Sequence, residues 1–512
     1  MKLHAWVLLL MVGCAAHGQN ESKPTTQQRA TNARRPDAVE DAQTPRTVAQ
    51  RRAEQAKTDK DDPARFKADK AQPSSEALKN QPDQGKVVGF DFSRDPLNAK
   101  KPMEKAEEIT AKDIADRPGV MEAQKKLLES RYNLTPKLDN AVKMSRGKPL
   151  AVGPTAKLKG GKSFDDLGQM SPDDIKREDL FPYPSLPHPK HASGGQVFPQ
   201  MQIEMFPRLE RFDVDFDLPE AFLPEFPPAI FLINRPELGD VSQGEVVSIN
   251  NFHRLFKDIL TPVQLDGLRM LVTPLPQEEF NATDDRKTLN PSLGVTCLDC
   301  HVNGHTTAQF HLNPDDRPQE RRFRLDTTSL RGVNQQQIHG SKRSLRSVED
   351  FTEFEQRTAY FNGDPTHAFK KGEVILDRVR VSHMAQFQNM LDFPPAPKLD
   401  VRTARLDPRK ASENEMRGEK LFFGKAQCAN CHQPPVYLDH QMHDLHLERF
   451  LNEAPDGPIK TFTLRGIKES PPYLHDGRCL TLEDTVEFFN LVLELKLTAE
   501  EKTDIVAFMR QL

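Results

Sequence analysis

The chain has 512 residues, of which 36% are hydrophobic and 41 are proline, and its formal net charge at pH 7 is −4. The hydrophobic content is low for a chain that is globular throughout, so we expect a sizeable part to be irregular or disordered. The small net charge gives no support for nucleic acid or for a strongly acidic substrate, and we expect no nucleic-acid partner.

Residues 1–18 read as a signal peptide, because Lys2 precedes a short apolar run and then small residues. Two cleavage sites compete. Met-Val-Gly-Cys resembles a bacterial lipobox, which would make Cys14 a lipidated first residue, whereas Ala16-His17-Gly18 fits an ordinary signal peptidase. Both sites predict an exported protein, periplasmic or at the outer surface, that meets the membrane only through a lipid anchor on Cys14.

Residues 19–85 consist largely of Gln, Lys, Arg, Asp, Pro and Ala, and we expect them to form a disordered tether. Residues 86–283 are predicted to form an extension that is partly helical and partly an extended arm. Helical spacing marks 120–132. The many prolines of 181–236 exclude helix and central strand, so their phenylalanines should pack on a neighbouring domain. The alternating FDVDFD of 212–217 predicts a half-buried edge strand.

The remaining part of the chain contains an internal duplication. The first copy reads CLDCH, then TTSLRGV, then IHGSKRSLRSVEDFTEF, and the second reads CANCH, then TFTLRGI, then LHDGRCLTLEDTVEFF. Two similar units imply two similar cofactor sites. We place the first unit at 284–400 and the second at 401–512. In the second, Ser412 with Glu415 and Thr498 with Glu501 form capping-box patterns, which predict two helices.

The chemistry is carried by Cys297, Cys300 and His301 in the first copy and by Cys428, Cys431 and His432 in the second. C-x-x-C-H is the attachment signature of c-type haem: two cysteines on one helical turn bond the ring, and the adjacent His reaches the iron. A zinc site or a disulfide within each pair leaves the adjacent His unexplained. The sequence therefore predicts two covalently bound c-type haems in a mainly α protein with two cytochrome c domains in tandem.

The second copy, with GEKLFFGKAQCANCH, TFTLRGIKESPPYLHDG and the terminal LTAEEKTDIVAFMRQL, resembles the bacterial di-haem cytochrome c peroxidase family. That family includes the methylamine-utilisation di-haem enzyme. The resemblance is strongest over 412–512, weaker over 290–364 and absent before about residue 240. It implies that the N-terminal haem meets hydrogen peroxide, that the C-terminal haem relays electrons to or from a partner protein, and that a calcium ion lies between the haem domains.

Peroxide cleavage needs an iron position that can open and an acid–base group beside it. His305, His311 and His339 are the candidates for a distal His, and Glu353 and Glu355 for a distal carboxylate. We select His311 and Glu355 as the predicted catalytic pair. Two further residues, Arg331 and Arg465 of the paired LRG motifs, are predicted to bind haem propionates through charge-assisted hydrogen bonds.

Two features depart from the family pattern. The family places a tryptophan just before the first copy's turn, but Trp6 in the predicted signal peptide is the only tryptophan, and Ile338 stands near that place. The family's C-terminal haem takes a Met or Tyr ligand fourteen residues after the His of H-D-G, and counting from His475 gives Phe489, which cannot bind iron. Other ligands for the second haem are then sought among Met201, Met205, Met384, Met442, His443, His446 and Met509.

Three hypotheses follow. The leading one is an exported di-haem oxidoreductase that reduces peroxide or oxidises an unknown substrate. The missing tryptophan and the missing ligand favour a non-catalytic di-haem electron carrier as an alternative. A di-haem oxygenase is the third, and it is distinguished from the first by dependence on dioxygen instead of peroxide.

Overall fold

The computed structural model describes residues 115–186, 205, 218–273, 296–312, 324–342, 345–356, 377–452 and 455–512. All of them belong to the second of two compact units, Gly85–Leu512, and the first unit is Met1–Gln84. The predicted signal peptide, the tether and the FDVDFD strand at 212–217 lie outside the described residues.

The described part is mainly helical, as predicted. Its α-helices are α5 (Arg117–Arg131), α6 (Phe164–Leu167), α7 (Pro172–Glu178), α9 (Phe252–Phe256), α10 (Pro262–Leu271), α11 (Cys297–Cys300), α12 (Val348–Glu355), α14 (Arg378–Gln388), α15 (Glu413–Phe422), α16 (Leu482–Val492) and α17 (Ala499–Met509). The 3₁₀ turns are η4 (Lys159–Gly161), η6 (Glu220–Phe222), η7 (Pro236–Leu238), η8 (Val302–Gly304), η10 (Val333–Gln335), η12 (Cys428–Asn430), η13 (Leu447–Arg449) and η14 (Ile467–Glu469).

The strands are short and form antiparallel pairs. They are β1 (Leu138–Lys143) with β2 (Pro149–Ala151), β3 (Phe231–Leu232) with β6 (Leu391–Asp392), β4 (Phe310–Leu312) with β5 (Arg324–Asp326), and β7 (Met442–His443) with β8 (Ile459–Lys460). The β4–β5 pair lies in the first copy and the β7–β8 pair in the second. In each copy a strand therefore leads into the LRG motif that follows it.

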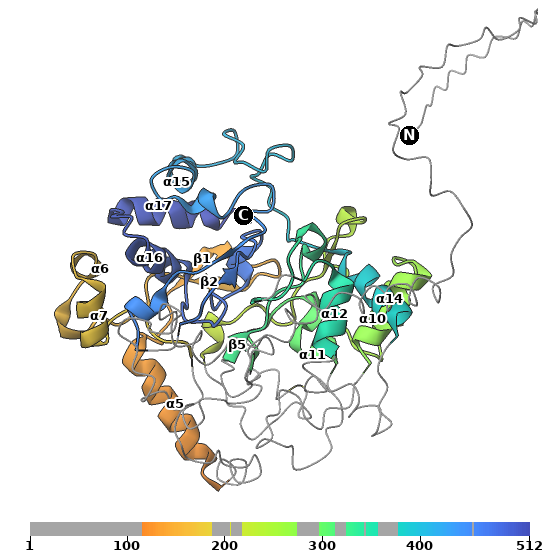
Figure 1. The fold of residues 1–512 in the computed structure, drawn as a ribbon. Helices are drawn as coiled ribbons and strands as arrows, with labels where there is room; N and C mark the ends of the chain where they lie inside the picture. Colours follow the sequence, from red (N-terminus) through yellow and green to blue (C-terminus); the bar gives the residue numbers. More distant parts are fainter. Residues whose placement is uncertain are drawn as a thin grey trace, which may run out of the picture. The chain divides into compact units, whose positions relative to one another are not determined.

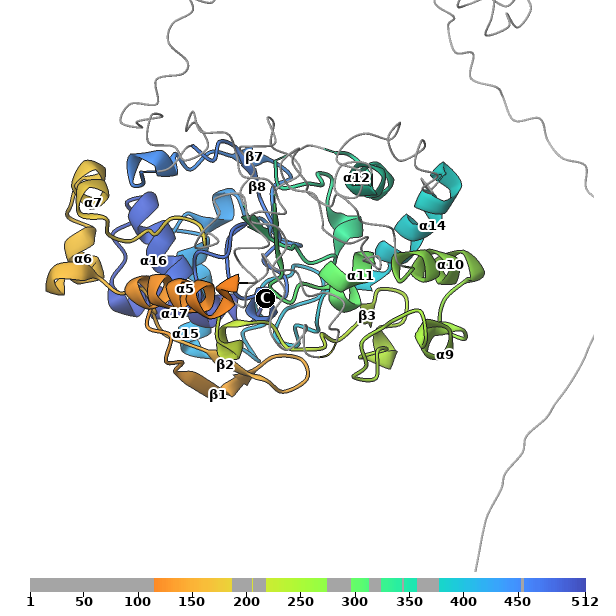
Figure 2. The same ribbon diagram turned by 90° about the horizontal axis from the view of Figure 1, so that it is seen from below.

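Two helix pairs cross closely, one on each side of this unit (Figures 1 and 2). A Cβ atom on Gly267 of α10 would lie 1.9 Å from the carbonyl oxygen of His383 in α14. A Cβ atom on Gly418 of α15 would lie 1.8 Å from the carbonyl oxygen of Asp504 in α17. Only glycine permits either backbone approach. The two copies thus repeat the same crossing around their C-x-x-C-H motifs.

The capping boxes predicted for the second copy are confirmed. Ser412 with Glu415 begins α15, and Thr498 with Glu501 begins α17. The last helix, α17, buries Ile505, Phe508 and Met509.

The N-terminal extension packs on the second copy. Its predicted helix is confirmed as α5, and Tyr132 at the end of α5 donates a hydrogen bond from its hydroxyl to the Arg478 carbonyl oxygen at 2.7 Å. The Asp484 carboxylate in α16 accepts from the Thr155 N–H at 2.7 Å and the Ala156 N–H at 3.1 Å. These contacts fix the extension against α16.

Phenylalanines of the proline-rich arm pack on a neighbouring part of the chain, as predicted. Phe181 and Phe222 are each 1% exposed and lie in one core with residues of the second copy. Its short regular elements are the 3₁₀ turn η6 and the two-residue strand β3, which lies in a two-stranded sheet with β6 and is therefore not a central strand. Pro219 precedes η6 as its N-cap with φ −57°, where a proline ring is tolerated, and β3 falls between prolines.

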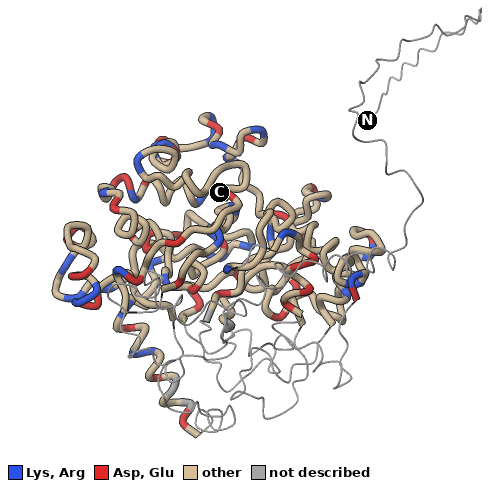
Figure 3. Tube along the Cα trace, in the orientation of Figure 1, with Lys and Arg blue, Asp and Glu red and all other residues tan. Residues whose placement is uncertain are grey.

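Charges are distributed without a dominant sign. Figure 3 shows basic and acidic residues interspersed along the described elements, in keeping with the small net charge. Among the described helices, none has the length and apolar character needed to cross a membrane.

Candidate functional site

The first C-x-x-C-H motif forms α11. Thr296 caps this helix, and its backbone N–H donates to the Asp299 carboxylate at 2.7 Å. His301 follows directly, with its ring Nδ1 2.8 Å from the Thr328 carbonyl oxygen. A carbonyl can only accept, so Nδ1 carries the proton and Nε2 keeps its lone pair. This is the arrangement of a metal-ligating histidine.

The second C-x-x-C-H motif repeats this arrangement on η12. The ring Nδ1 of His432 lies 2.9 Å from the Tyr437 carbonyl oxygen, so Nδ1 carries the proton, as in His301. Burial lowers the pKa of His432, so its imidazole stays neutral as a ligand must. Cys428 and Cys431 form no disulfide, and burial raises the pKa of Cys428 to about 12.

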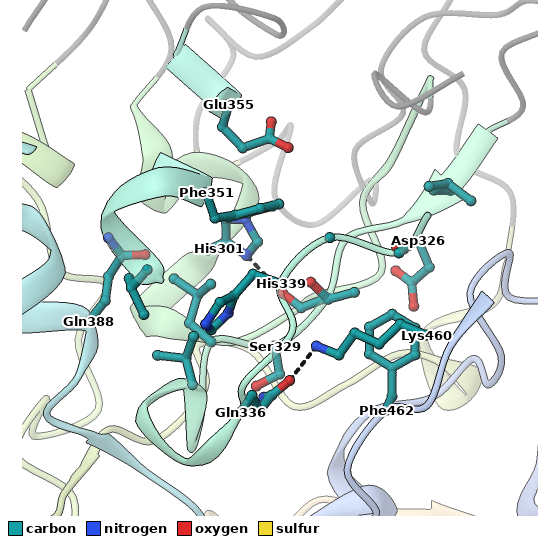
Figure 4. Close-up of a pocket in the computed structure, with 17 residues that line it drawn as sticks. His301, Asp326, Ser329, Gln336, His339, Phe351, Glu355, Gln388, Lys460 and Phe462 are labelled. Carbon is teal, nitrogen blue, oxygen red and sulfur yellow. Dashed lines mark hydrogen bonds between the residues drawn. The ribbon is translucent and has the colours of Figure 1, made fainter. Parts of the chain in front are cut away.

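A hollow of about 790 Å³, including space open to solvent, adjoins His301. Apolar residues from three segments form much of the wall, with His301, His339 and Glu355 among the polar ones (Figure 4). Leu330, Val333, Val348 and Phe351 are the apolar contributors near the histidines. The mixed apolar and polar lining and the position of His301 at its edge fit a haem.

A second hollow of about 760 Å³, again including space open to solvent, lies beside the first and shares with it Asp326, Thr328, Ser329, Gln336 and Phe462. Arg331 and Arg465, the arginines of the two LRG motifs, both line this second hollow. The equivalent arginines of the two copies therefore line the same hollow.

The candidates for the distal groups of the first haem lie in different places in the structure. Glu355 at the end of α12 and His339 line the hollow with His301, and Figure 4 shows both side chains there. Glu353 instead pairs with Arg378, with the Glu353 Oε2 to Arg378 nitrogen distance at 2.5 Å. His311 lies on β4, where its backbone pairs with Leu325, and its side chain lies outside the described part.

His305 is not available as an iron ligand. Its Nε2 donates to the Glu469 carbonyl oxygen at 3.0 Å, and its Nδ1 accepts from the Ser329 hydroxyl at 2.7 Å. The ring is 2% exposed, and burial followed by the charge of Arg331 lowers its pKa well below the usual value. Both nitrogens are engaged, so the structure removes this residue from the sequence candidates.

Arg331 has a protein partner that the sequence did not indicate. Its guanidinium lies 2.8 Å from the Glu469 carboxylate and also donates to the Ala229 carbonyl oxygen at 2.7 Å. The Arg465 guanidinium donates to the carbonyl oxygen of Leu512 at 2.9 Å. Nε of Arg331 is buried without a hydrogen-bond partner. An anion in the second hollow is a suitable partner for it.

The candidate sixth ligands of the second haem lie in different surroundings. Met384 and Met509 are buried in separate apolar cores. His443 contacts the Asp439 carboxylate at 2.6 Å and lies near Cys431. His446 is 66% exposed. Phe489 packs against the core, with its ring centroid 5.1 Å from that of Phe488.

Of the other methionines named from the sequence, Met442 lies on β7, Met205 is exposed, and Met201 lies outside the described residues.

Sequence reasoning missed Lys460 and Asp326, which also line the first hollow. The signal was present, because aligning the LRG motifs places KTFTLRG over DTTSLRG and puts these two residues at equivalent positions. It also missed that α10 belongs with α14. There the signal was the shared spacing of Gly267 and Gly418 to an apolar pair three and four residues later.

Part of this chain is similar in sequence to several known proteins. No family model matches it. It is 31% identical over 159 residues to the cytochrome c551 peroxidase of Nitrosomonas europaea, covering 28% of this chain and 46% of that protein. It is 31% identical over 168 residues to the methylamine utilization protein MauG of Methylorubrum extorquens, covering 28% of this chain and 47% of that protein. A third relative is the cytochrome-c peroxidase IdrP1 of a Pseudomonas species, 26% identical over 22% of this chain and 43% of its own.

Among solved structures, a MauG-like protein associated with microbial copper homeostasis matches 43% of this chain and 82% of its own, with 18% identity and a TM-score of 0.32. The chain spans about half the length of the curated relatives it matches. The resemblance predicted from the sequence is confirmed: over part of its length this chain is related to the di-haem cytochrome c peroxidases, among them MauG.

Proposed function

We propose that this protein is an exported di-haem c-type oxidoreductase with peroxidase-like chemistry. One observation carries the proposal: both C-x-x-C-H histidines bind a backbone carbonyl through Nδ1, and His301 adjoins a hollow that also holds a carboxylic acid, Glu355. Two cysteines and one histidine would hold each haem, Cys297, Cys300 and His301 for the first and Cys428, Cys431 and His432 for the second. The bound haems supply the redox chemistry and the position for peroxide.

The residues of the chain have separate tasks in this proposal. Glu355 moves a proton between the two oxygens of a peroxide that enters the first hollow, as a general acid–base group. The apolar wall of the hollow limits water around that proton transfer. Arg331 and Arg465 bind haem propionates at the second hollow, and Arg331 does so through the side of its guanidinium that Glu469 leaves open. His311 remains a predicted partner of Glu355.

We further propose the domain organisation. The extension packs on the second haem domain, residues 401–512. The first haem domain begins before α10, earlier than residue 284, because α10 crosses α14 through Gly267 as α15 crosses α17 through Gly418. Export rests on the predicted signal peptide at 1–18, with the tether at 19–85. The calcium ion implied by the resemblance stays a prediction. Asp456, His475 and Asp476 bring possible metal-ligating atoms together, but the carboxylates of Asp456 and Asp476 both pair with Arg478.

The test compares Glu355→Gln with Glu353→Gln in the purified two-haem protein. General acid–base groups typically contribute about 10²–10⁴-fold, so Glu355→Gln should slow peroxide consumption by at least 100-fold while cyanide binding to the first haem persists. Glu353 faces Arg378 instead of His301, so Glu353→Gln should stay within about twofold of the parent. Equal rates in the two variants would remove Glu355 from the mechanism.

A non-catalytic electron carrier is the second candidate function. The engagement of both His305 nitrogens and the presence of Phe489 in place of a ligand favour it. It predicts two low-spin haems that bind neither peroxide nor cyanide, and it predicts no peroxide consumption by the parent protein.

A further inference from the structure

Lys460 is a buried lysine that reaches from the second copy of the duplication into the hollow of the first. It ends β8, and its backbone N–H donates to the Ser341 carbonyl oxygen at 2.9 Å. Its side chain lines the hollow that also contains His301, and only 7% of the residue is exposed. It therefore joins the two haem units at the first haem's site.

The ammonium group of Lys460 has neutral neighbours. It donates to the Gln336 side-chain oxygen and lies 4.9 Å from the centroid of the Phe462 ring (Figure 4). Burial alone lowers its pKa to about 7, with no carboxylate acting to raise it. Lys502, by contrast, is a lysine of the same copy whose side chain is 11% exposed and has Glu487 at 2.6 Å. A buried ammonium without an acid is costly, and an anion in the hollow would offset that cost.

The other titratable groups of the hollow do not supply this anion. Burial raises the pKa of Asp326 well above its usual value, which favours its neutral form. Burial, with the charge of Lys460, lowers the pKa of His339 to about 4, so His339 is neutral at pH 7. Glu355 comes from α12 at the other end of the hollow in Figure 4. None of these three groups supplies a negative charge beside Lys460, so a bound ligand would have to supply it.

We propose that Lys460 binds a carboxylate of the first haem across the junction between the two copies. This inference rests on the proposed function, because a c-type haem brings two propionate carboxylates into a hollow of this kind. Hydrogen peroxide is neutral near pH 7 and would not compensate the ammonium. Gln336 and Phe462 hold the side chain in place, so the salt bridge would need little reorganisation.

The experiment uses the full two-haem protein and the variants Lys460→Gln, Lys460→Arg and Lys425→Gln. Lys425 is a control from the same copy, because its ammonium is 44% exposed and pairs with Glu501 outside the hollow. The readouts are the propionate bending band of the first haem in resonance Raman spectra and the reduction potential of each haem by spectroelectrochemistry.

We expect Lys460→Gln to shift the propionate band of the first haem and to lower that haem's potential, because a nearby cation favours the reduced form. The second haem should not change, Lys460→Arg should restore both readouts, and Lys425→Gln should alter neither. An unchanged propionate band in Lys460→Gln overturns the proposal even where the potential moves, since a charge can act through space.

If Lys460→Gln does not accumulate with two haems, Lys460→Arg decides, and a band that differs from the parent overturns the proposal. A parent protein without two haems or without peroxide consumption would instead refute the proposed function. The two failures are therefore distinguishable.

Discussion

Breaking the Arg331–Glu469 ion pair should destabilise the folded protein strongly. The pair joins the LRG arginine of the first copy to η14 of the second at 2.8 Å, and the two side chains are only 5% and 4% exposed. Removing one partner of a buried pair typically costs about 3–5 kcal/mol, because the other charge stays buried. The Ala229 carbonyl oxygen remains as a partner at 2.7 Å, so we expect about 3 kcal/mol for Glu469→Gln.

The assay is denaturant unfolding of the haem-loaded protein, followed by far-ultraviolet circular dichroism, with Glu122→Gln as the control. Glu122 and Lys126 form an exposed pair at 3.5 Å, and such pairs contribute about 0–1 kcal/mol. A loss below about 1 kcal/mol in Glu469→Gln would refute the reasoning, because it would mean that the buried Arg331 charge does not depend on Glu469 as its ion-pair partner.

Two further predictions concern His305 and Phe489. Because the folded-state pKa of His305 lies below its unfolded value near 6.5, the unfolded state binds more protons, and stability should fall as the pH drops below about 6.5. His305→Gln should flatten that part of a stability profile from pH 8 to 5, and an unchanged slope would contradict it. Phe489→Met should give the second haem a low-spin His–Met spectrum, whereas unaltered bands would show that position 489 does not face the iron.

Local patterns in the sequence predicted local structure well. The capping boxes at Ser412 and Thr498 depend on residues three apart, so α15 and α17 could be placed from sequence. The C-x-x-C-H motifs likewise needed only short spacing. The pairing of α10 with α14 was harder to predict, because Gly267 and His383 are 116 positions apart in the sequence (383 minus 267).

Long-range partners decided the remaining site residues. Arg331 was predicted to bind a propionate, yet Glu469 reaches it from the other copy. From the sequence His305 was a candidate distal ligand, but in the structure Ser329 and Glu469 form hydrogen bonds with both of its ring nitrogens. In the sequence Lys460 is an ordinary charged residue, and only its burial beside the hollow of His301 distinguishes it. Burial and cross-copy contacts are tertiary properties that short patterns do not encode.

The coordination of the two irons tests the central claim most directly. Electron paramagnetic resonance and resonance Raman spectra of the purified protein, recorded with and without peroxide, report the ligands of each haem. We predict two haems, with the first responding to peroxide and to cyanide. A protein without two haems, or with two low-spin haems that respond to neither ligand, would contradict the account.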